Sequence, residues 1–240
     1  MDFKIFDDDQ VNNYITYPAS LTCYPESSVD ANSSFNEQYF PKKVPDKVRL
    51  SKQSLINSSF VDEAKETSLI IKKILPNLST ITDATANVGC NTISFAQHFS
   101  HVNAVELDPL EYNRLENNIN QYKLNNVSIY NEDYTKILDK LSQDVVFIDA
   151  PDGGKKHFLL EKFIQCLSKI KIDNIVNYLI KHKLARLVVL KVPRNIWLND
   201  ISYPYKRVDV YRNLSQLSSL IFVSNERLNS VNNKIILLHD

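Results

Sequence analysis

The fold is decided by Asp83-Ala-Thr-Ala-Asn-Val-Gly89-Cys-Asn-Thr92, a stretch that joins an expected strand over 80–83 to an expected helix over 91–99. Small side chains and one glycine let the backbone approach a ligand closely, and the start of the helix offers free N–H groups. The stretch lacks the GxGxxG spacing, so it fits a dinucleotide pyrophosphate poorly. Asp83 is predicted either to hold a cationic amino group or to cap the turn.

Strands and helices alternate along the rest of the chain. Helical spacing of apolar residues predicts helices over 61–74, 109–122, 134–141, 158–167 and 174–182. Short apolar runs predict strands over 102–106, 127–130, 145–148, 187–190, 221–223 and 234–238. This order predicts an α/β fold with a mostly parallel sheet and helices on both faces. Ligands bind such sheets at the carboxyl ends of the strands, so the loops after the first four strands form the candidate site.

Acidic residues follow the second and third expected strands. Glu106 lies about 20 residues past the glycine turn, the place where a carboxylate accepts the two hydroxyl groups of a ribose. Asp108 is better suited to cap the next helix, with Pro109 at its first position. Asp133 is predicted either to accept a hydrogen bond from an adenine amino group or to cap a short helix.

The fourth loop is Asp149-Ala-Pro151-Asp152-Gly153-Gly154, directly after an apolar strand. The chain has only 3 glycines, and two of them lie here. An acidic residue, a proline and paired glycines make a shaped loop, which favours a functional role over a plain surface turn.

Composition excludes several classes of protein. The 28 Lys and Arg residues balance 28 Asp and Glu residues, which argues against broad contact with a nucleic-acid duplex but permits recognition of an RNA end. No apolar run reaches about 18 residues, so no membrane span is expected. The three separated cysteines, Cys23, Cys90 and Cys166, favour a reducing compartment, cytoplasmic or nuclear, and neither a disulfide framework nor a zinc site. Abundant Asn, Ile and Lys are typical of an AT-rich genome, such as that of a large DNA virus.

Residues 1–45 are polar and without sustained periodicity, so we expect a partly ordered N-terminal arm before a domain over 46–240. Aromatic residues are scattered through this arm: Tyr14, Tyr17, Tyr24, Tyr39 and Phe40. They are predicted to pin the arm to the domain, and the alternative is that some line a base-binding site.

Together the four loops resemble those of the class I methyltransferases, and in particular the trimethylguanosine synthase (RNA cap guanine-N2 methyltransferase) family. That family methylates the exocyclic N2 amine of a 7-methylguanosine cap. The segment Asp83–Ala96 is similar to its DxxxGxGGNTIxFA motif, and the Asn91-Thr92 pair is the most specific part of the match. Further similar segments are Val105–Pro109, Asp144–Gly154, Pro193-Arg194-Asn195 and Arg227-Leu228-Asn229.

The resemblance implies a Rossmann-like class I methyltransferase that uses S-adenosyl-L-methionine and acts on a 7-methylguanosine cap or capped RNA. No metal is expected to take part, and a monomer is favoured. The implied cofactor-binding residues are Asp83, Ala84, Thr85, Gly89, Asn91, Thr92, Glu106 and Asp133. The implied catalytic residues are Asp149, Pro151 and Asp152, and the implied substrate-binding residues are Arg194, Asn195 and Trp197. Lys155 or Lys156 could join Arg194 in contacting cap phosphates.

The chain departs from the family at the motif SPPW, which reads Asp149-Ala150-Pro151-Asp152 here. In the family, that tryptophan stacks on the cationic 7-methylguanine, and Asp152 cannot stack. Trp197 could take its place or could simply pack against the protein. Cys90 replaces the second glycine of the first motif.

Three other functions stay open. A ribose 2′-O-methyltransferase uses a Lys-Asp-Lys-Glu set, for which Asp149, Lys191 and Glu226 are candidates, together with Lys65 or Lys72. A DNA adenine methyltransferase would use the fourth loop as a variant of DPPY, but the aromatic residue that grips the base is missing. A non-catalytic methyltransferase-like subunit is the third.

Overall fold

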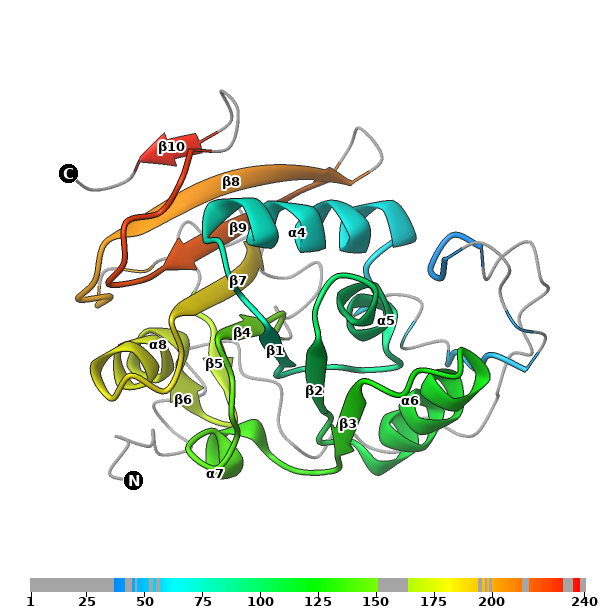
Figure 1. Ribbon diagram of the computed structural model, residues 1–240. Coiled ribbons are helices and arrows are strands. Elements are labelled where there is room, and N and C mark those ends of the chain that lie inside the picture. Colours follow the sequence, from blue (N-terminus) through cyan, green and yellow to red (C-terminus); the bar gives the residue numbers. More distant parts are fainter. Residues whose placement is uncertain are drawn as a thin grey trace.

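A mixed eight-stranded sheet forms the centre of the computed structural model, with the strand order β10-β8-β9-β7-β4-β1-β2-β3 (Figure 1). The structure describes residues 37–41, 45, 47–51, 54, 57–150, 164–193, 196, 198, 200–212, 216–230 and 235–237 of the chain. The strands are β1 (Thr80–Asp83), β2 (His101–Val105), β3 (Val127–Tyr130), β4 (Val145–Ile148), β7 (Leu187–Pro193), β8 (Tyr205–Arg212), β9 (Gln216–Val223) and β10 (Ile235–Leu237).

Five neighbouring strands, β3, β2, β1, β4 and β7, run parallel, and β9, β8 and β10 continue the sheet in antiparallel pairs. From β1 the chain proceeds outward through β2 to β3, and then returns to place β4 on the other side of β1. The loops after β1 and β4 therefore leave the sheet on opposite sides of a switch point. Such a point is where parallel α/β sheets bind ligands.

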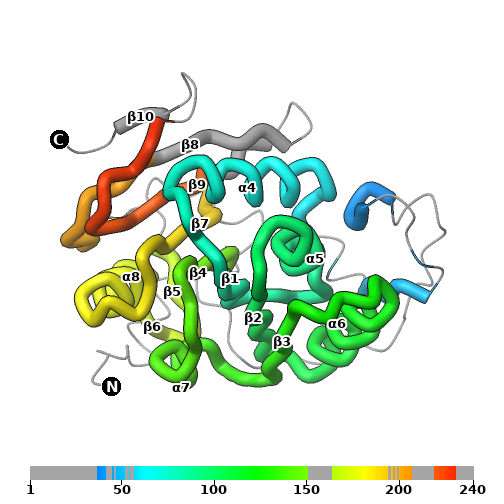
Figure 2. The backbone as a smooth tube through the Cα atoms, viewed as in Figure 1, coloured from blue at the N-terminus to red at the C-terminus, as the bar shows by residue number. Residues whose placement is uncertain are grey.

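Helices lie on both faces of the sheet (Figure 2). Side chains alternate along a strand, so each face of the sheet presents apolar side chains to the helices that cover it. Val146 and Ile148 of β4 pack with α8 (Ile172–Lys181), which belongs to the core on one face. Val145 and Phe147 pack on the other face with α4 (Val61–Ile74) and α5 (Cys90–Ala96). Both pairs are fully buried or nearly so, which explains the continuous apolar sequence of β4. The remaining helices are α6 (Pro109–Gln121) and the single turn α7 (Tyr134–Ile137).

The predicted α/β fold, with a mostly parallel sheet covered on both faces, is confirmed. Helix 61–74 and strands 80–83, 127–130 and 145–148 have the predicted bounds. The predicted helix over 158–167 is wrong at its end, because Cys166–Leu167 forms β5 and pairs with β6 (Ile170–Lys171) in a hairpin; residues 158–163 lie outside the described residues. Strand β8 was not predicted.

The short segment 47–51 is bound to α6 by one buried amide. Asn118 accepts a hydrogen bond from the Arg49 N–H at 2.7 Å and donates to the Arg49 carbonyl at 2.9 Å. It also donates to the carbonyl of Val88, in the loop after β1, at 2.8 Å. Tyr39 and Phe40, two aromatic residues of the expected arm, are buried in the same cluster as Leu115 of α6. Residues 1–36 lie outside the described residues.

Candidate active site

The loop after β1 turns at Gly89, whose backbone has the left-handed φ of 97°. A Cβ added there would lie 2.9 Å from Cδ1 of Leu115 on α6. The φ favours glycine because other residues rarely adopt it, and a methyl group would also push against the end of the Leu115 side chain. Gly89 therefore leaves room for the Leu115 side chain of α6 beside the start of α5. The predicted close approach of this loop to a ligand stays a prediction.

Asp83, at the end of β1, is a completely buried carboxyl group. Its Oδ2 accepts a hydrogen bond of 2.7 Å from Oγ1 of Thr92, while its Oδ1 is buried and accepts none from the described residues. Burial raises the pKa of Asp83 to about 7, the Thr92 hydrogen bond opposes the shift, and the nearby carboxylate of Asp149 adds to it. A buried carboxyl group with an unused oxygen fits a cationic amino group well.

Glu106, after β2, connects two loops through its carboxylate. Its Oε2 accepts from the Asn87 N–H at 2.7 Å, and its Oε1 accepts from the Asp108 N–H at 2.8 Å. Burial raises the pKa of Glu106 to about 7 against these two hydrogen bonds. Each oxygen retains a second lone pair, so the predicted role of accepting ribose hydroxyl groups fits the geometry.

Leu107 is a candidate that the sequence reasoning missed. Its side chain is 50% exposed beside Glu106, two residues past the end of β2. Asn131 holds this turn, since its Nδ2 donates to the carbonyls of Glu106 and Leu107 at 2.9 and 3.2 Å. An exposed apolar surface next to Glu106, the predicted ribose-binding carboxylate, fits the face of a base. The sequence signal was an apolar residue between Glu106 and Asp108.

The two predicted helix caps are observed. Asp108 accepts from the Leu110 N–H at 2.7 Å and caps α6, with Pro109 at its first position. Asp133 caps α7 and accepts from both the N–H and the hydroxyl group of Thr135 at 2.9 and 2.7 Å. These contacts use Oδ1 of Asp133, and the cap explains the residue type without any ligand.

The loops after β1 and β4 are joined by backbone and side-chain contacts. The Asp149 N–H donates to Oγ1 of Thr85 at 2.9 Å, and the Ala84 N–H donates to the carbonyl of Phe147 at 2.9 Å. Asn91, at the start of α5, is buried, and its Oδ1 accepts no hydrogen bond from the residues that the structure places. The predicted residues of the first and fourth loops are thus brought together as far as Ala150.

Lys191 of β7 points its ammonium group into a cluster of three acceptors. Its Nζ lies 2.7 Å from Oγ of Ser59, 3.1 Å from Oδ2 of Asp149 and 3.3 Å from Oε1 of Glu63. Ser59 lies just before α4 and Glu63 lies in its first turn, and neither residue was singled out from the sequence. Their contact with Lys191 spans more than half the chain, so no local pattern could reveal it.

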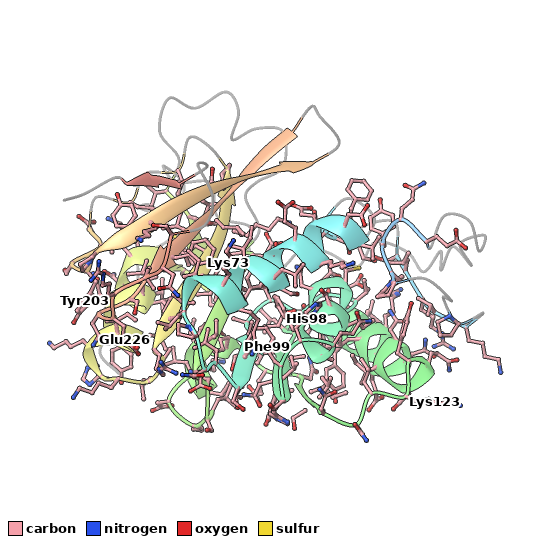
Figure 3. The ribbon with its side chains drawn as sticks, turned by 45° about the horizontal axis from the view of Figure 1, so that its top comes forward. Lys73, His98, Phe99, Lys123, Tyr203 and Glu226 are labelled. Carbon is pink, nitrogen blue, oxygen red and sulfur yellow. The ribbon has the colours of Figure 1, made fainter. Side chains whose placement is uncertain are left out.

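Glu226 does not join this cluster, which corrects the predicted Lys-Asp-Lys-Glu set. It follows the antiparallel strand β9, so it lies at the other edge of the sheet, near Tyr203 (Figure 3). There it forms a bidentate ion pair with Arg186, with Nε–Oε1 and Nη2–Oε2 distances of 2.8 and 3.1 Å. Lys72 donates to the carbonyl of Leu78 at 2.8 Å, which directs it away from this cluster, and the side chain of Lys65 is exposed.

Several predicted site residues lie outside the described residues, and the structure does not place them: Pro151, Asp152, Gly153, Gly154, Lys155, Lys156, Arg194, Asn195 and Trp197. Within the described ranges, no group of three or more His, Cys, Asp or Glu residues could hold a metal ion. None of the helices in the part of the chain that the structure describes is long and apolar enough to cross a membrane.

The sheet order and the site at its switch point are those of a class I, S-adenosylmethionine-dependent methyltransferase. Comparison with known proteins identifies the family: the model of the RNA cap guanine-N2 methyltransferase family matches residues 78–238. The chain belongs to this family.

Two individual proteins are similar to this chain. An uncharacterized protein of Acanthamoeba polyphaga mimivirus, L320, is 34% identical over 134 residues, which cover 55% of this chain and 51% of the viral protein. The chain thus spans about half the length of this relative. A solved structure from Porphyromonas gingivalis W83, described as a candidate methyltransferase, superposes with a TM-score of 0.58 at 14% identity. The superposition covers 76% of this chain and 45% of that one, and it supports the fold alone.

Proposed function

We propose that the protein transfers a methyl group from S-adenosylmethionine to the exocyclic N2 amine of 7-methylguanosine in RNA caps. The family supports this acceptor, and one observation on the site carries it further: among the described residues, carboxyl groups outnumber cations at the carboxyl edge of the sheet. Asp83, Asp149 and Glu63 gather there around the ammonium of Lys191. The methyl donor and 7-methylguanine are both cations, so a site with surplus negative charge favours both.

The donor would be held by residues from the first two loops. Asp83 offers its unused Oδ1 to the amino group of the donor, and Glu106 offers lone pairs to the ribose hydroxyls. Leu107 would pack against the adenine, with Asp133 at its edge. S-adenosylmethionine, when bound, would supply an electrophilic methyl group carried on a sulfonium. The electron pair of the C–S bond stays on sulfur when the methyl group is transferred.

Asp149 would orient and deprotonate the acceptor amine. Its carboxylate lies at the end of β4, and its backbone N–H is fixed to Thr85 of the donor loop at 2.9 Å. A carboxylate that accepts an N–H from the amine orients the nitrogen lone pair toward the methyl group. As the N–C bond forms and the C–S bond breaks, the nitrogen becomes cationic, and Asp149 can accept the proton that it releases.

The test is methyl transfer from labelled S-adenosylmethionine to 7-methylguanosine nucleotides, with GTP and capped RNA alongside. We expect label on the 7-methylguanosine nucleotides and none on GTP. Label that appears on capped RNA only, and that nuclease digestion assigns to the ribose, would replace the proposal with 2′-O-methylation. A protein that binds the donor and labels none of the three would be a non-catalytic member of its family.

Ribose 2′-O-methylation is the second candidate. The Lys-Asp-Lys-Glu set of those enzymes brings a lysine close to an aspartate, and Lys191 contacts Asp149 here. The acceptors around Lys191 count against it, since a lysine that activates a hydroxyl group must direct a free lone pair toward that group.

A further inference from the structure

The ammonium group of Lys191 is fully used by the protein itself. An ammonium has three N–H donors and no acceptor, and Ser59, Asp149 and Glu63 provide three acceptors within 3.3 Å. The Lys191 side chain is 11% exposed, and that of Glu63 is 3% exposed. Lys191 therefore cannot bind a cap phosphate or act as a base without giving up one of these contacts.

The two carboxylates also hold Lys191 in its charged form. Opposite charges within about 4–6 Å favour the ionised state of each partner, and the effect is larger where water is excluded. The same argument applies in reverse to Asp149, whose side chain is 22% exposed beside the ammonium. The pair thus keeps Asp149 ionised and restricts the rotation of its carboxylate.

We propose that Lys191 is a positioning residue that acts through Asp149, and that Ser59 and Glu63 hold Lys191 in place for this task. The consequence for the reaction rests on the role of Asp149 in the proposed function. Lys191 would fix the carboxylate in the orientation and charge state that the acceptor amine needs, without touching the acceptor itself.

The residues that hold Lys191 come from a part of the chain outside the family match. Ser59 and Glu63 lie just before and within the first turn of α4, whereas the match covers residues 78–238. Helix α4 packs on the sheet through Ile70, Ile71 and Ile74 near its end, and Glu63 in its first turn contacts Lys191 of β7. This segment would complete the catalytic edge.

Charged groups on each element packed around Asp149 share one electrostatic environment. Asp83 comes from β1, Lys191 from β7 and Glu63 from α4. The pKa of Asp83 is raised by the charge of Asp149 and lowered by that of Lys191, as expected if the three lie close together. Removal of Lys191 would take a positive charge away from three neighbouring carboxyl groups, so Asp149 would bind a proton more readily.

The first experiment compares Lys191→Met and Lys191→Arg with the wild-type chain. For Lys191→Met, we expect kcat for 7-methylguanosine methylation to fall roughly 10–100-fold, with KM for the methyl donor changed less than about twofold. The acid limb of the pH–rate profile should move to higher pH. Lys191→Arg should restore most of the rate, and Lys140→Met, at an exposed lysine, should change nothing. A loss of rate that follows thermal stability, with an unmoved pH profile, would show a merely structural role.

The second experiment does not depend on methyl transfer. The Asp149 carboxyl carbon, assigned by comparison with Asp149→Asn, is titrated by ¹³C NMR in the wild type and in Lys191→Met. A midpoint that rises in the variant supports the proposal even if 7-methylguanosine is not the acceptor, and an unchanged midpoint overturns it. Should Lys191→Met fail to fold, Ser59→Ala, which loosens Lys191 without changing the charge beside Asp149, serves in the same titration. A smaller rise of the midpoint is then expected, and no rise overturns the proposal.

Discussion

The hydroxyl group of Thr92 donates a hydrogen bond of 2.7 Å to Oδ2 of Asp83, from the first turn of α5 to the end of β1. This contact favours the ionised form of a carboxyl group that burial pushes toward the neutral form. The charge of Asp83, and with it the attraction for a cationic ligand, therefore changes close to neutral pH.

Affinity for S-adenosylmethionine should weaken as the pH falls below about 7, the pKa of Asp83, because the protonated carboxyl group no longer attracts the amino group. The dissociation constant should increase up to about tenfold per pH unit below that point. Isothermal titration calorimetry from pH 5.5 to 8.5 measures it. The pH at which the affinity begins to fall should be higher for Thr92→Val, which loses the hydrogen bond to Asp83, and unchanged for Thr92→Ser. Affinity independent of pH would exclude Asp83 from the donor site.

The stability of the ligand-free protein should show the opposite trend with pH. The folded state holds the Asp83 proton more tightly than the unfolded state, so the free energy of unfolding falls as the pH rises from 3.8 through about 7. Asp83→Asn removes this loss and keeps an acceptor for Thr92. Urea unfolding at pH 8 should therefore find the variant more stable than the wild type, although it no longer binds the donor. Asp139→Asn, at an exposed position, is the control.

Asp149→Ala should abolish methyl transfer and leave donor binding nearly intact. The carboxylate faces the reacting edge, whereas the backbone N–H that binds Thr85 remains in the variant. Single-turnover transfer and donor affinity, measured on the same preparation, separate the two effects. An equal loss of both would mean that Asp149 belongs to the donor site.

Gly89→Ala should destabilise the fold by about 1–3 kcal/mol, because alanine at a φ of 97° is strained and its methyl group meets Leu115. Leu115→Ala alone should cost about 2–5 kcal/mol through the cavity that it leaves. The double variant should lose less than the sum of the two, since the new methyl group fills part of that space. Strict additivity in denaturant unfolding would rule out the predicted contact.

Glu226→Gln should leave methyl transfer unchanged. Its side chain is 39% exposed and pairs with Arg186 at the edge of the sheet away from Asp149. Because solvent screens this exposed pair, the loss of stability should stay within about 1 kcal/mol. A drop in transfer rate that exceeds the change in stability would return Glu226 to the catalytic set.

Sequence periodicity predicted the parallel half of the sheet well, because buried parallel strands are continuous apolar runs such as Val145–Ile148. It failed at the β5–β6 hairpin, where Ser168 and Lys169 both adopt positive φ, at 48° and 68°. Turns of this kind are normally marked by Asn or Gly, and neither is present here. Strand β8 has Asp209 between Val208 and Val210, an alternation of apolar and charged residues that did not lead to a predicted strand.

The site was predictable where it follows strand ends and was not where distant elements meet. Asp83, Glu106 and Asp149 each end a strand, so topology alone brings them to one edge. Glu63 meets Lys191 only because α4 lies across the sheet above β7, a relationship that no local spacing encodes. Glu226 was misplaced because its position after a strand was considered without the direction of that strand.

The buried amide of Asn118 also bears on how the chain is made. Arg49, its backbone partner, precedes it by 69 residues. At ribosomal speeds of 5–20 residues per second, roughly 3–14 seconds separate their synthesis. During that time Val48 and Leu50, both buried in the finished protein, have no helix α6 to pack against. Segment 47–51 thus leaves the ribosome before the helix on which it packs, and it offers chaperones an apolar target in the interval.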